Sequence, residues 1–182
     1  VERNVPYNAI YKAYKMGNRL DKDYHGTDLL SDILANGKSS RLYQQLVKKH
    51  KIFGTIDAYI LGSIDNGLFI INGYVMEEID IETAESAIEH EIEKIKNEPV
   101  SEYELNKVAN KVEATLEFSE MSCLTKAMNL AFCELLGDAN DINNEIHKYR
   151  RVKCADIKRI AANILRKDNC STLYYLSRKK EK

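Results

Sequence analysis

The chain has 182 residues, of which 44% are hydrophobic, 30% are charged and only two are proline. This composition is typical of globular proteins and argues against both a disordered segment and a membrane protein. The 27 basic and 28 acidic residues give a formal net charge of −1, which argues against a nucleic-acid-binding surface. A chain of this length buries about 70% of its unfolded surface, so one sizeable core can form without disulfide or metal support.

The two ends of the sequence say little about compartment. The chain opens with Val1 rather than Met, which indicates an excised or processed piece, and it contains no secretory or membrane-spanning apolar run. The one basic cluster, formed by Arg178, Lys179, Lys180 and Lys182, is expected to be a solvated tail. We expect a soluble protein, cytoplasmic or periplasmic, with no membrane span and no nucleic-acid partner.

The four cysteines, Cys123, Cys133, Cys154 and Cys170, form no C-x-x-C pair. Cys123 and Cys133 fall on one predicted helix about 15 Å apart, which is too far for a disulfide. Buried free thiols are therefore favoured over redox or metal chemistry, in keeping with a reducing compartment.

The first third of the chain is predicted to contain one strand, two helices and a hairpin. Aromatic and β-compatible residues predict a strand at 7–16, and helices follow at 23–36 and 40–51. Two β-rich runs, 52–61 and 68–76, flank the turn Asp65-Asn66-Gly67 and predict an antiparallel hairpin. Gly62 and Ser63 lengthen its loop, so an extra bulge residue is expected there.

The triplet Gly37-Lys38-Ser39 between the two helices matches the end of the phosphate-binding loop G-x-x-x-x-G-K-[ST]. The other glycine of that loop is replaced by Asp32, whose carboxylate would repel phosphate. The preceding residues recur at helical spacing, whereas a phosphate loop follows a buried strand. We therefore favour a helix that ends at Asn36-Gly37 and a next helix capped by Ser39 or Ser40, with nucleotide binding through Lys38 as the less favoured alternative.

The next segment is predicted to form two amphipathic helices. The first begins at Asp80 and is broken by Glu98-Pro99, and its apolar stripe is Ile81, Ala84, Ile88, Ile92 and Ile95. Ser101 and Glu104 form a capping box that opens the second helix, whose stripe is Leu105, Val108, Val112 and Leu116.

The last third of the chain is predicted to be mainly helical. The helix at 121–136 is apolar on more than one side, which predicts that neighbouring elements cover it, and Gly137 ends it. Shorter helices at 141–149 and 156–165 lead into a closing strand at 171–176. Because the strands are few and segregated from the helices, the predicted fold class is α+β: an antiparallel sheet with helices packed on one face. Without a linker or internal repeat, residues 1–182 are expected to form a single domain.

No complete metal motif is visible in the sequence. His25, His50, His90 and His147 are dispersed, and the closest approach to H-x-x-E-H is the segment from His90 to Lys94. Its second ligand position is Lys94, whose protonated ammonium has no lone pair for zinc. We interpret this segment as a solvated helix face.

Other reactive groups also lack a complete pattern. Three carboxylate pairs stand near helix starts or loops, where the helix N-terminus favours negative charge: Glu77 with Glu78, Asp138 with Asp141, and Asp21 with Asp23. Ser39 and Ser40 lack a G-x-S-x-G elbow, and nothing in the sequence places His50 beside them. On physical grounds alone the sequence shows no complete active site.

Three segments in the correct order resemble one family. They are LLSDILANGKSSRLYQQLVKKHKIFGTIDAYILGSIDNGLFIINGYV at 29–75, PVSEYELNKVANKVEATL at 99–116 and VKCADIKRIAANILRKDNCSTLYY at 152–175. Together they resemble the second domain of a half-subunit in the pitrilysin/insulinase-type zinc peptidases, which include mitochondrial processing peptidase. The resemblance covers nearly the whole chain.

The resemblance implies that this chain is the domain without the zinc site. In that family one domain bears H-x-x-E-H on a helix, and the comparable helix here, Asp28 to Leu34, has neither histidine. Some partner domains supply an arginine and a tyrosine to the peptide carbonyl, and the matching positions here are Val47 and Gly54. We therefore expect no catalytic residue, no metal ligand and no cofactor in this chain, and zinc in the parent protein. No substrate-binding residue is assigned.

The function implied is that of a non-catalytic wall of a peptidase chamber. Peptide hydrolysis would use a zinc-bound water elsewhere in the parent, a metalloendopeptidase. The implied partners are a preceding zinc-binding domain of the same chain, a second half-subunit in a homodimer or heterodimer, and an extended peptide. The alternative is a scaffold or partner subunit of the same architecture whose parent has no peptidase activity.

Overall fold

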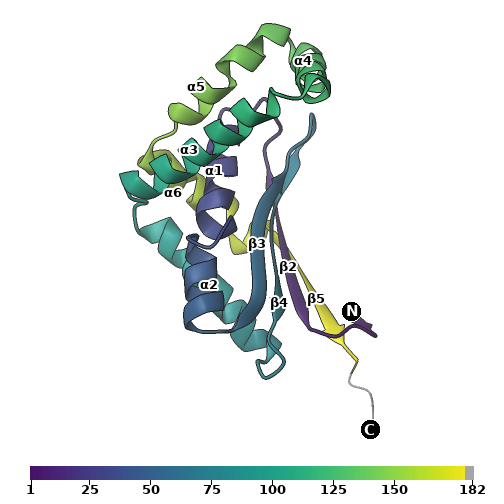
Figure 1. Ribbon diagram of the computed structural model, residues 1–182. Helices are drawn as coiled ribbons and strands as arrows, with labels where there is room; N and C mark the ends of the chain where they lie inside the picture. Colours follow the sequence, from purple (N-terminus) through teal and green to yellow (C-terminus); the bar gives the residue numbers. More distant parts are fainter. Residues whose placement is uncertain (179–182) are drawn as a thin grey trace.

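The computed structural model describes residues 1–178, and these form a five-stranded sheet with helices on one face (Figure 1). The strands are β1 (Glu2–Arg3), β2 (Ala9–Met16), β3 (Phe53–Leu61), β4 (Gly67–Val75) and β5 (Cys170–Ser177), in the order β1-β5-β2-β4-β3. All pairings are antiparallel except that of the short β1 with β5. The predicted α+β class is confirmed. Three lysines of the basic tail, Lys179, Lys180 and Lys182, lie outside the described residues.

The helical layer lies on one side of the sheet and leaves the other side open (Figure 1). The α-helices are α1 (Tyr24–Ala35), α2 (Ile81–Asn97), α3 (Glu102–Ser119), α4 (Cys123–Leu136), α5 (Glu145–Arg150) and α6 (Cys154–Ile164). A π-helical segment, η1 (Tyr43–Lys49), and the 3₁₀ segments η2 (Ala139–Asn144) and η3 (Lys167–Asn169) complete the chain. Within residues 1–178 no helix combines the length and apolarity needed to cross a bilayer.

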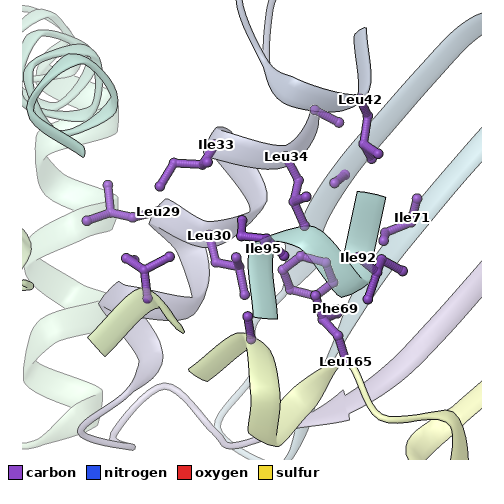
Figure 2. Close-up of a cluster of buried hydrophobic side chains, with 14 of the residues drawn as sticks. Leu29, Leu30, Ile33, Leu34, Leu42, Phe69, Ile71, Ile92, Ile95 and Leu165 are labelled. Atoms are coloured by element: carbon purple, nitrogen blue, oxygen red, sulfur yellow. The ribbon is translucent and has the colours of Figure 1, made fainter. Parts of the chain in front are cut away.

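The core lies between the sheet and the helices (Figure 2). α1 contributes Leu29, Leu30 and Leu34, which are fully buried. Leu30 and Leu34 point toward the β4 side chains Phe69 and Ile71, and Leu29 points away from them. α2 adds Ile92 and Ile95 from the other side of the same cluster. Each large apolar side chain buried in this way stabilises the fold by roughly 1.5–3 kcal/mol.

The local helix signals of the sequence are confirmed. The predicted stripe of α2 is buried from Ala84 to Ile95, and Asp80 caps the helix by accepting a hydrogen bond from the Thr83 N–H at 2.7 Å. The capping box of α3 is complete, because the Ser101 hydroxyl accepts from the Glu104 N–H while the Glu104 carboxylate accepts from the Ser101 N–H, both at 3.2 Å.

The Gly37-Lys38-Ser39 triplet follows a helix, as predicted, and not a buried strand. Gly37 has φ +89°, a left-handed conformation that favours glycine and ends α1. The predicted serine cap is wrong: the Ser40 hydroxyl donates to the Gly37 carbonyl at 2.7 Å, and the following π-helical turn has no side-chain cap.

Two features of the sheet differ from prediction. The pairing of β1 with β5 was not predicted, because it joins residues at opposite ends of the chain. The expected bulge beside Gly62 and Ser63 is also wrong, since the only register shift in the β3–β4 pairing falls between Phe53 and Thr55, at the far end of the hairpin. There Gly54 and the adjoining turn let one strand carry an extra residue.

The helix predicted at 121–136 exists as α4, but the prediction that neighbours cover it is wrong. Within the described residues none of its side chains is buried, and Leu124 and Met128 are 71% and 63% exposed. All four cysteines are free, as predicted, yet Cys123 is exposed and the other three are only partly buried. The thiols of Cys123 and Cys133 are not buried because no second layer covers α4.

Candidate functional site

The sheet face without helices is rich in tyrosine. Side chains alternate between the two faces of a strand, so Tyr11, Tyr59, Tyr74 and Tyr175 point away from the core from four adjacent strands. The register places Tyr74 and Tyr175 on either side of Ala9, and Tyr59 and Tyr74 are 41% and 47% exposed. This face offers a row of hydroxyl groups to whatever lies against it.

The hydroxyl groups of these tyrosines lie close enough to influence one another. Partial burial raises the pKa of Tyr11, and the nearby Tyr74, Tyr59 and Tyr175 raise it further. Because the pKa moves upward from 10.0, the Tyr11 hydroxyl is neutral at physiological pH. The Tyr11 hydroxyl therefore acts as a hydrogen-bond donor and acceptor and not as a charged group.

A shallow hollow is lined by Tyr11, Asp57, Tyr59 and Asn72 of the sheet, with Ala35 and Asn36 at the end of α1 and Ala58 completing its lining, so it includes residues of the helical side as well as of this face. The Asn72 Oδ1 is buried and has no hydrogen-bond partner within the described residues. A buried amide oxygen without a partner costs free energy, and a ligand N–H group would satisfy it once the side chains that cover it move aside. The hollow suits a hydrogen-bonding ligand such as a peptide backbone.

The helix compared with the family's zinc helix is α1, and its residues do not fit a metal. Leu29, Leu30 and Leu34 face the core with no exposed surface. The Asp28 carboxylate accepts a 2.6 Å hydrogen bond from the Tyr149 hydroxyl, which anchors α5 to α1. Two other positions match those at which some partner domains of the family carry an arginine and a tyrosine. Of these, Val47 is partly buried against the core and Gly54 is exposed on β3.

The segment from His90 to Lys94 lies within α2, and part of it is on the surface. His90 and Glu93 are exposed, and the Glu93 carboxylate pairs with Lys96 at 2.6 Å. Glu91, placed on a solvated face from the sequence, is instead buried and pairs with Lys94 at 2.7 Å. Across residues 1–178, no group of three or more His, Cys, Asp or Glu side chains could hold a metal ion.

Four of the six carboxylates singled out in the sequence have structural partners, whereas Glu77 and Glu78 are exposed between β4 and α2. Asp23 accepts two hydrogen bonds from Arg159, at 2.6 and 2.7 Å, which lower the pKa of Asp23 despite its partial burial. Asp21 accepts from the Asp23 N–H, and Asp138 caps η2. Asp141 pairs with Lys148 at 3.2 Å.

Ser39 also has a structural partner, on α3. The Ser39 hydroxyl accepts from Lys107 at 3.0 Å, and His50 is exposed at the end of η1.

Sequence comparison decides the family. A protein-family sequence model, described as the peptidase M16 inactive domain, matches residues 1–112. The chain belongs to this family. Among curated proteins none matches the sequence.

Solved structures show the same fold for this M16 inactive domain. A protease from Helicobacter pylori superposes with a TM-score of 0.89 at 22% identity, over 96% of this chain and 43% of that chain. The inactive peptidase domain of a proposed zinc protease from Bordetella parapertussis superposes with a TM-score of 0.88 at 21% identity, over 100% of this chain and 97% of that chain. A chain of complex III2 from Candida albicans superposes with a TM-score of 0.80 at 14% identity, over 96% of this chain and 44% of that chain. The M16 inactive domain thus spans less than half of the Helicobacter pylori protease chain.

The family model and the Bordetella parapertussis domain agree on one point. Both are described as inactive peptidase domains. The resemblance to processing-peptidase half-subunits is therefore confirmed at the level of family and fold.

The M16 inactive domain also contains a buried charged cluster that the sequence analysis missed. Lys12 is buried on the core side of β2, and its Nζ lies 2.7 Å from both the Glu85 and the Glu89 carboxylates of α2. Burial lowers the pKa of Lys12, but the two carboxylates raise it by more. Partial burial raises the pKa of Glu85, and hydrogen bonds from Lys12 and Tyr174 bring it below its ordinary value. The alternation of Ile10, Lys12 and Tyr14 was the signal that could have revealed this cluster.

A second network joins α1 to α5. The Glu145 carboxylate lies 2.7 Å from Arg19 and 3.1 Å from His25 Nε2, and the His25 ring contacts that of Tyr149 edge to face. Arg19 also donates to the Tyr24 hydroxyl at 2.7 Å. These charges pair with one another, so the network holds helices together.

Proposed function

We propose that this chain is the non-catalytic domain of a zinc-dependent endopeptidase, in which its open sheet face forms one wall of the substrate chamber. Membership of the peptidase M16 inactive-domain family carries the proposal, because it implies a catalytic partner. The open tyrosine face supplies the surface on which an extended peptide would lie.

The chemistry of this face supports contact with peptide backbone. Tyrosine hydroxyls donate and accept hydrogen bonds, and the Asn72 Oδ1, which is buried without a partner, would accept from a peptide N–H group once the side chains that cover it move aside. The Tyr11 hydroxyl is neutral and Asp57 is the one charged residue among those that line the hollow, so this part of the wall repels acidic peptide side chains. Such a surface favours unfolded peptides of varied sequence.

The catalytic centre is placed outside this chain. The core leucines of α1 and the paired side chains of α2 do not fit a zinc ion. We therefore assign the zinc to a companion domain of a longer parent protein. A second half-subunit, as a homodimer or heterodimer, would close the chamber.

The test uses the parent protein and an unfolded peptide substrate. Asn72→Ala in the parent is expected to raise KM about fivefold, the equivalent of one hydrogen bond of about 1 kcal/mol, with little change in kcat. Tyr103→Ala, which removes an exposed tyrosine from the first turn of α3, is the matched control and should leave KM unchanged. Chelator-sensitive cleavage by the parent and none by the chain alone would support the proposal, whereas an unchanged KM for Asn72→Ala would contradict the peptide wall.

A scaffold role for the parent is the second candidate. The fold likeness to a chain of complex III2 favours it, since that chain comes from a respiratory assembly. A purified parent that cleaves no peptide in the presence of added zinc would favour the scaffold over the peptidase.

A further inference from the structure

Asp57 is an isolated negative charge on the open sheet face. Among the outward-pointing residues of β2, β3, β4 and β5, the charged ones are Asp57 and Lys15. The register keeps them apart, because Asp57 lies in one row with Asn72 and Tyr11, whereas Lys15 lies four residues further along β2. The Asp57 side chain is exposed, and within residues 1–178 its carboxylate forms neither an ion pair nor a hydrogen bond. This carboxylate is therefore available to a cation from outside the described chain.

The side chains around Asp57 add hydrogen-bond acceptors and no positive charge. The hollow beside it is lined by Tyr11, Tyr59 and Asn72, and its lining contains no lysine, arginine or histidine. The Asn72 Oδ1 is buried and has no hydrogen-bond partner among the described residues. An amide oxygen has two lone pairs, so it can accept from a peptide N–H group and from a second donor. The hollow therefore has an excess of acceptors over donors.

Helix α1 adds to the negative potential of the hollow. Its last residue, Ala35, and its C-cap residue, Asn36, belong to the lining. The carboxyl end of a helix carries a partial negative charge, which stabilises a nearby cation. α1 has no basic residue in its last turn that would offset this charge. A full negative charge and the negative end of a helix dipole thus meet at one place.

The tyrosine rings favour an organic cation over a metal ion. The faces of aromatic rings such as those of Tyr11 and Tyr59 attract ammonium and guanidinium groups, and the methylene stems of lysine and arginine pack on apolar surface. A metal ion needs several ligating side chains, and across residues 1–178 no group of three or more His, Cys, Asp or Glu could hold one. The lining therefore suits a basic side chain.

We propose that this hollow is a subsite for one lysine or arginine side chain of an extended peptide. The proposal rests on the proposed function, which places a peptide along the open face, and it adds that Asp57 determines which side chain is preferred. The ammonium or guanidinium group donates to the Asp57 carboxylate. The end of α1 and the rings of Tyr11 and Tyr59 stabilise its charge.

The test measures peptide binding to the parent protein, with metal removed by a chelator so that no peptide is cleaved. Two fluorescent unfolded peptides differ at one position, which is lysine in one and acetyllysine in the other, and fluorescence anisotropy gives the Kd of each. The wild type should bind the lysine peptide about fivefold more tightly. This preference should shrink in about 1 M salt, because the Asp57 carboxylate is exposed and its attraction is screened. Equal Kd values for the two peptides would overturn the subsite.

Asp57→Asn isolates the charge, because it keeps the size of the side chain. The variant should reduce the preference for the lysine peptide to less than about twofold. The matched control is Asp65→Asn in the turn of the same hairpin, an exposed position outside the lining of the hollow, and it should keep the preference of the wild type. A preference that persists in Asp57→Asn would overturn the role of Asp57. Failure of the wild type to bind either peptide would instead contradict the peptide wall, and the subsite with it, so the two proposals fail in different ways.

Discussion

Lys12 places an ammonium group on the core side of a strand, where only a paired charge is tolerated. Glu85 and Glu89 of α2 form ion pairs with it. The hydroxyl of Thr172, on β5, accepts a longer hydrogen bond of 3.4 Å from the Lys12 Nζ. The cluster joins the sheet to the helix that packs on it. Removing the lysine would leave two half-buried carboxylates without a partner, and this is costly.

Lys12→Ala should lower the free energy of unfolding by about 2–3 kcal/mol, below the value for a fully buried pair because water reaches the carboxylates. Urea unfolding measures the change. Lys15→Ala, on the same strand but at an exposed position, is the control and should change the free energy by less than about 0.5 kcal/mol. Equal effects of the two substitutions would show that the cluster contributes nothing.

Glu104 makes stability depend on pH. Two hydrogen bonds from Arg41, both 2.9 Å, lower the pKa of Glu104 from its ordinary 4.5 despite partial burial. Because the folded-state pKa is the lower one, this stabilisation is present above about pH 4.5 and is lost as the pH falls through the folded-state value. Glu104→Gln keeps the capping box but removes the charge. Between pH 6 and about pH 3 the variant should therefore lose less unfolding free energy than the wild type, and an equal loss in urea titrations would contradict this assignment.

Among the elements, the β3–β4 hairpin has little space for a larger side chain at Gly67, where the nearest atom belongs to the backbone. A Cβ added to Gly67 would lie 2.5 Å from the Leu61 carbonyl oxygen, so the backbone would have to shift. Gly67→Ala should therefore lower the free energy of unfolding by about 1–3 kcal/mol in urea titrations. Gly54→Ala, whose Cβ would meet nothing closer than 3.7 Å, is the control and should be nearly neutral. A neutral Gly67→Ala would mean that the hairpin adjusts freely.

Elements with local signals were predictable from the sequence. The stripe of α2 and the box of Ser101 with Glu104 depend on residues three or four apart, so the sequence contains all that fixes them. The π-helical turn of η1 was not predictable, because a shift in hydrogen bonding leaves the order of its apolar residues unchanged.

Contacts between distant residues were harder to predict. The pairing of β1 with β5 joins Glu2 to Leu176, and no local pattern encodes it. The apolar residues of α4 predicted a buried helix, yet none of its side chains is buried. The periodicity of a sequence does not show which element, if any, packs against an apolar helix face. In the candidate site the tyrosines were visible in the sequence, but the hollow at Asn72 depends on the register of three strands.

At the scale of the whole molecule, the fold separates a stabilising side from a binding side. The helices and the buried clusters of Lys12 and Glu145 stabilise one face of the sheet, and the opposite face, which carries the tyrosines, is open. Under the proposed function, this open face is the part of an inactive peptidase domain that meets the substrate.

The most direct test of the central claim is the zinc content of the purified chain, measured by mass spectrometry after dialysis against a zinc-containing buffer. The account predicts far less than one zinc per chain, since the positions compared with the family's zinc helix are core leucines and paired polar groups. One zinc per chain, lost on mutation of His90 or any other single histidine, would contradict it.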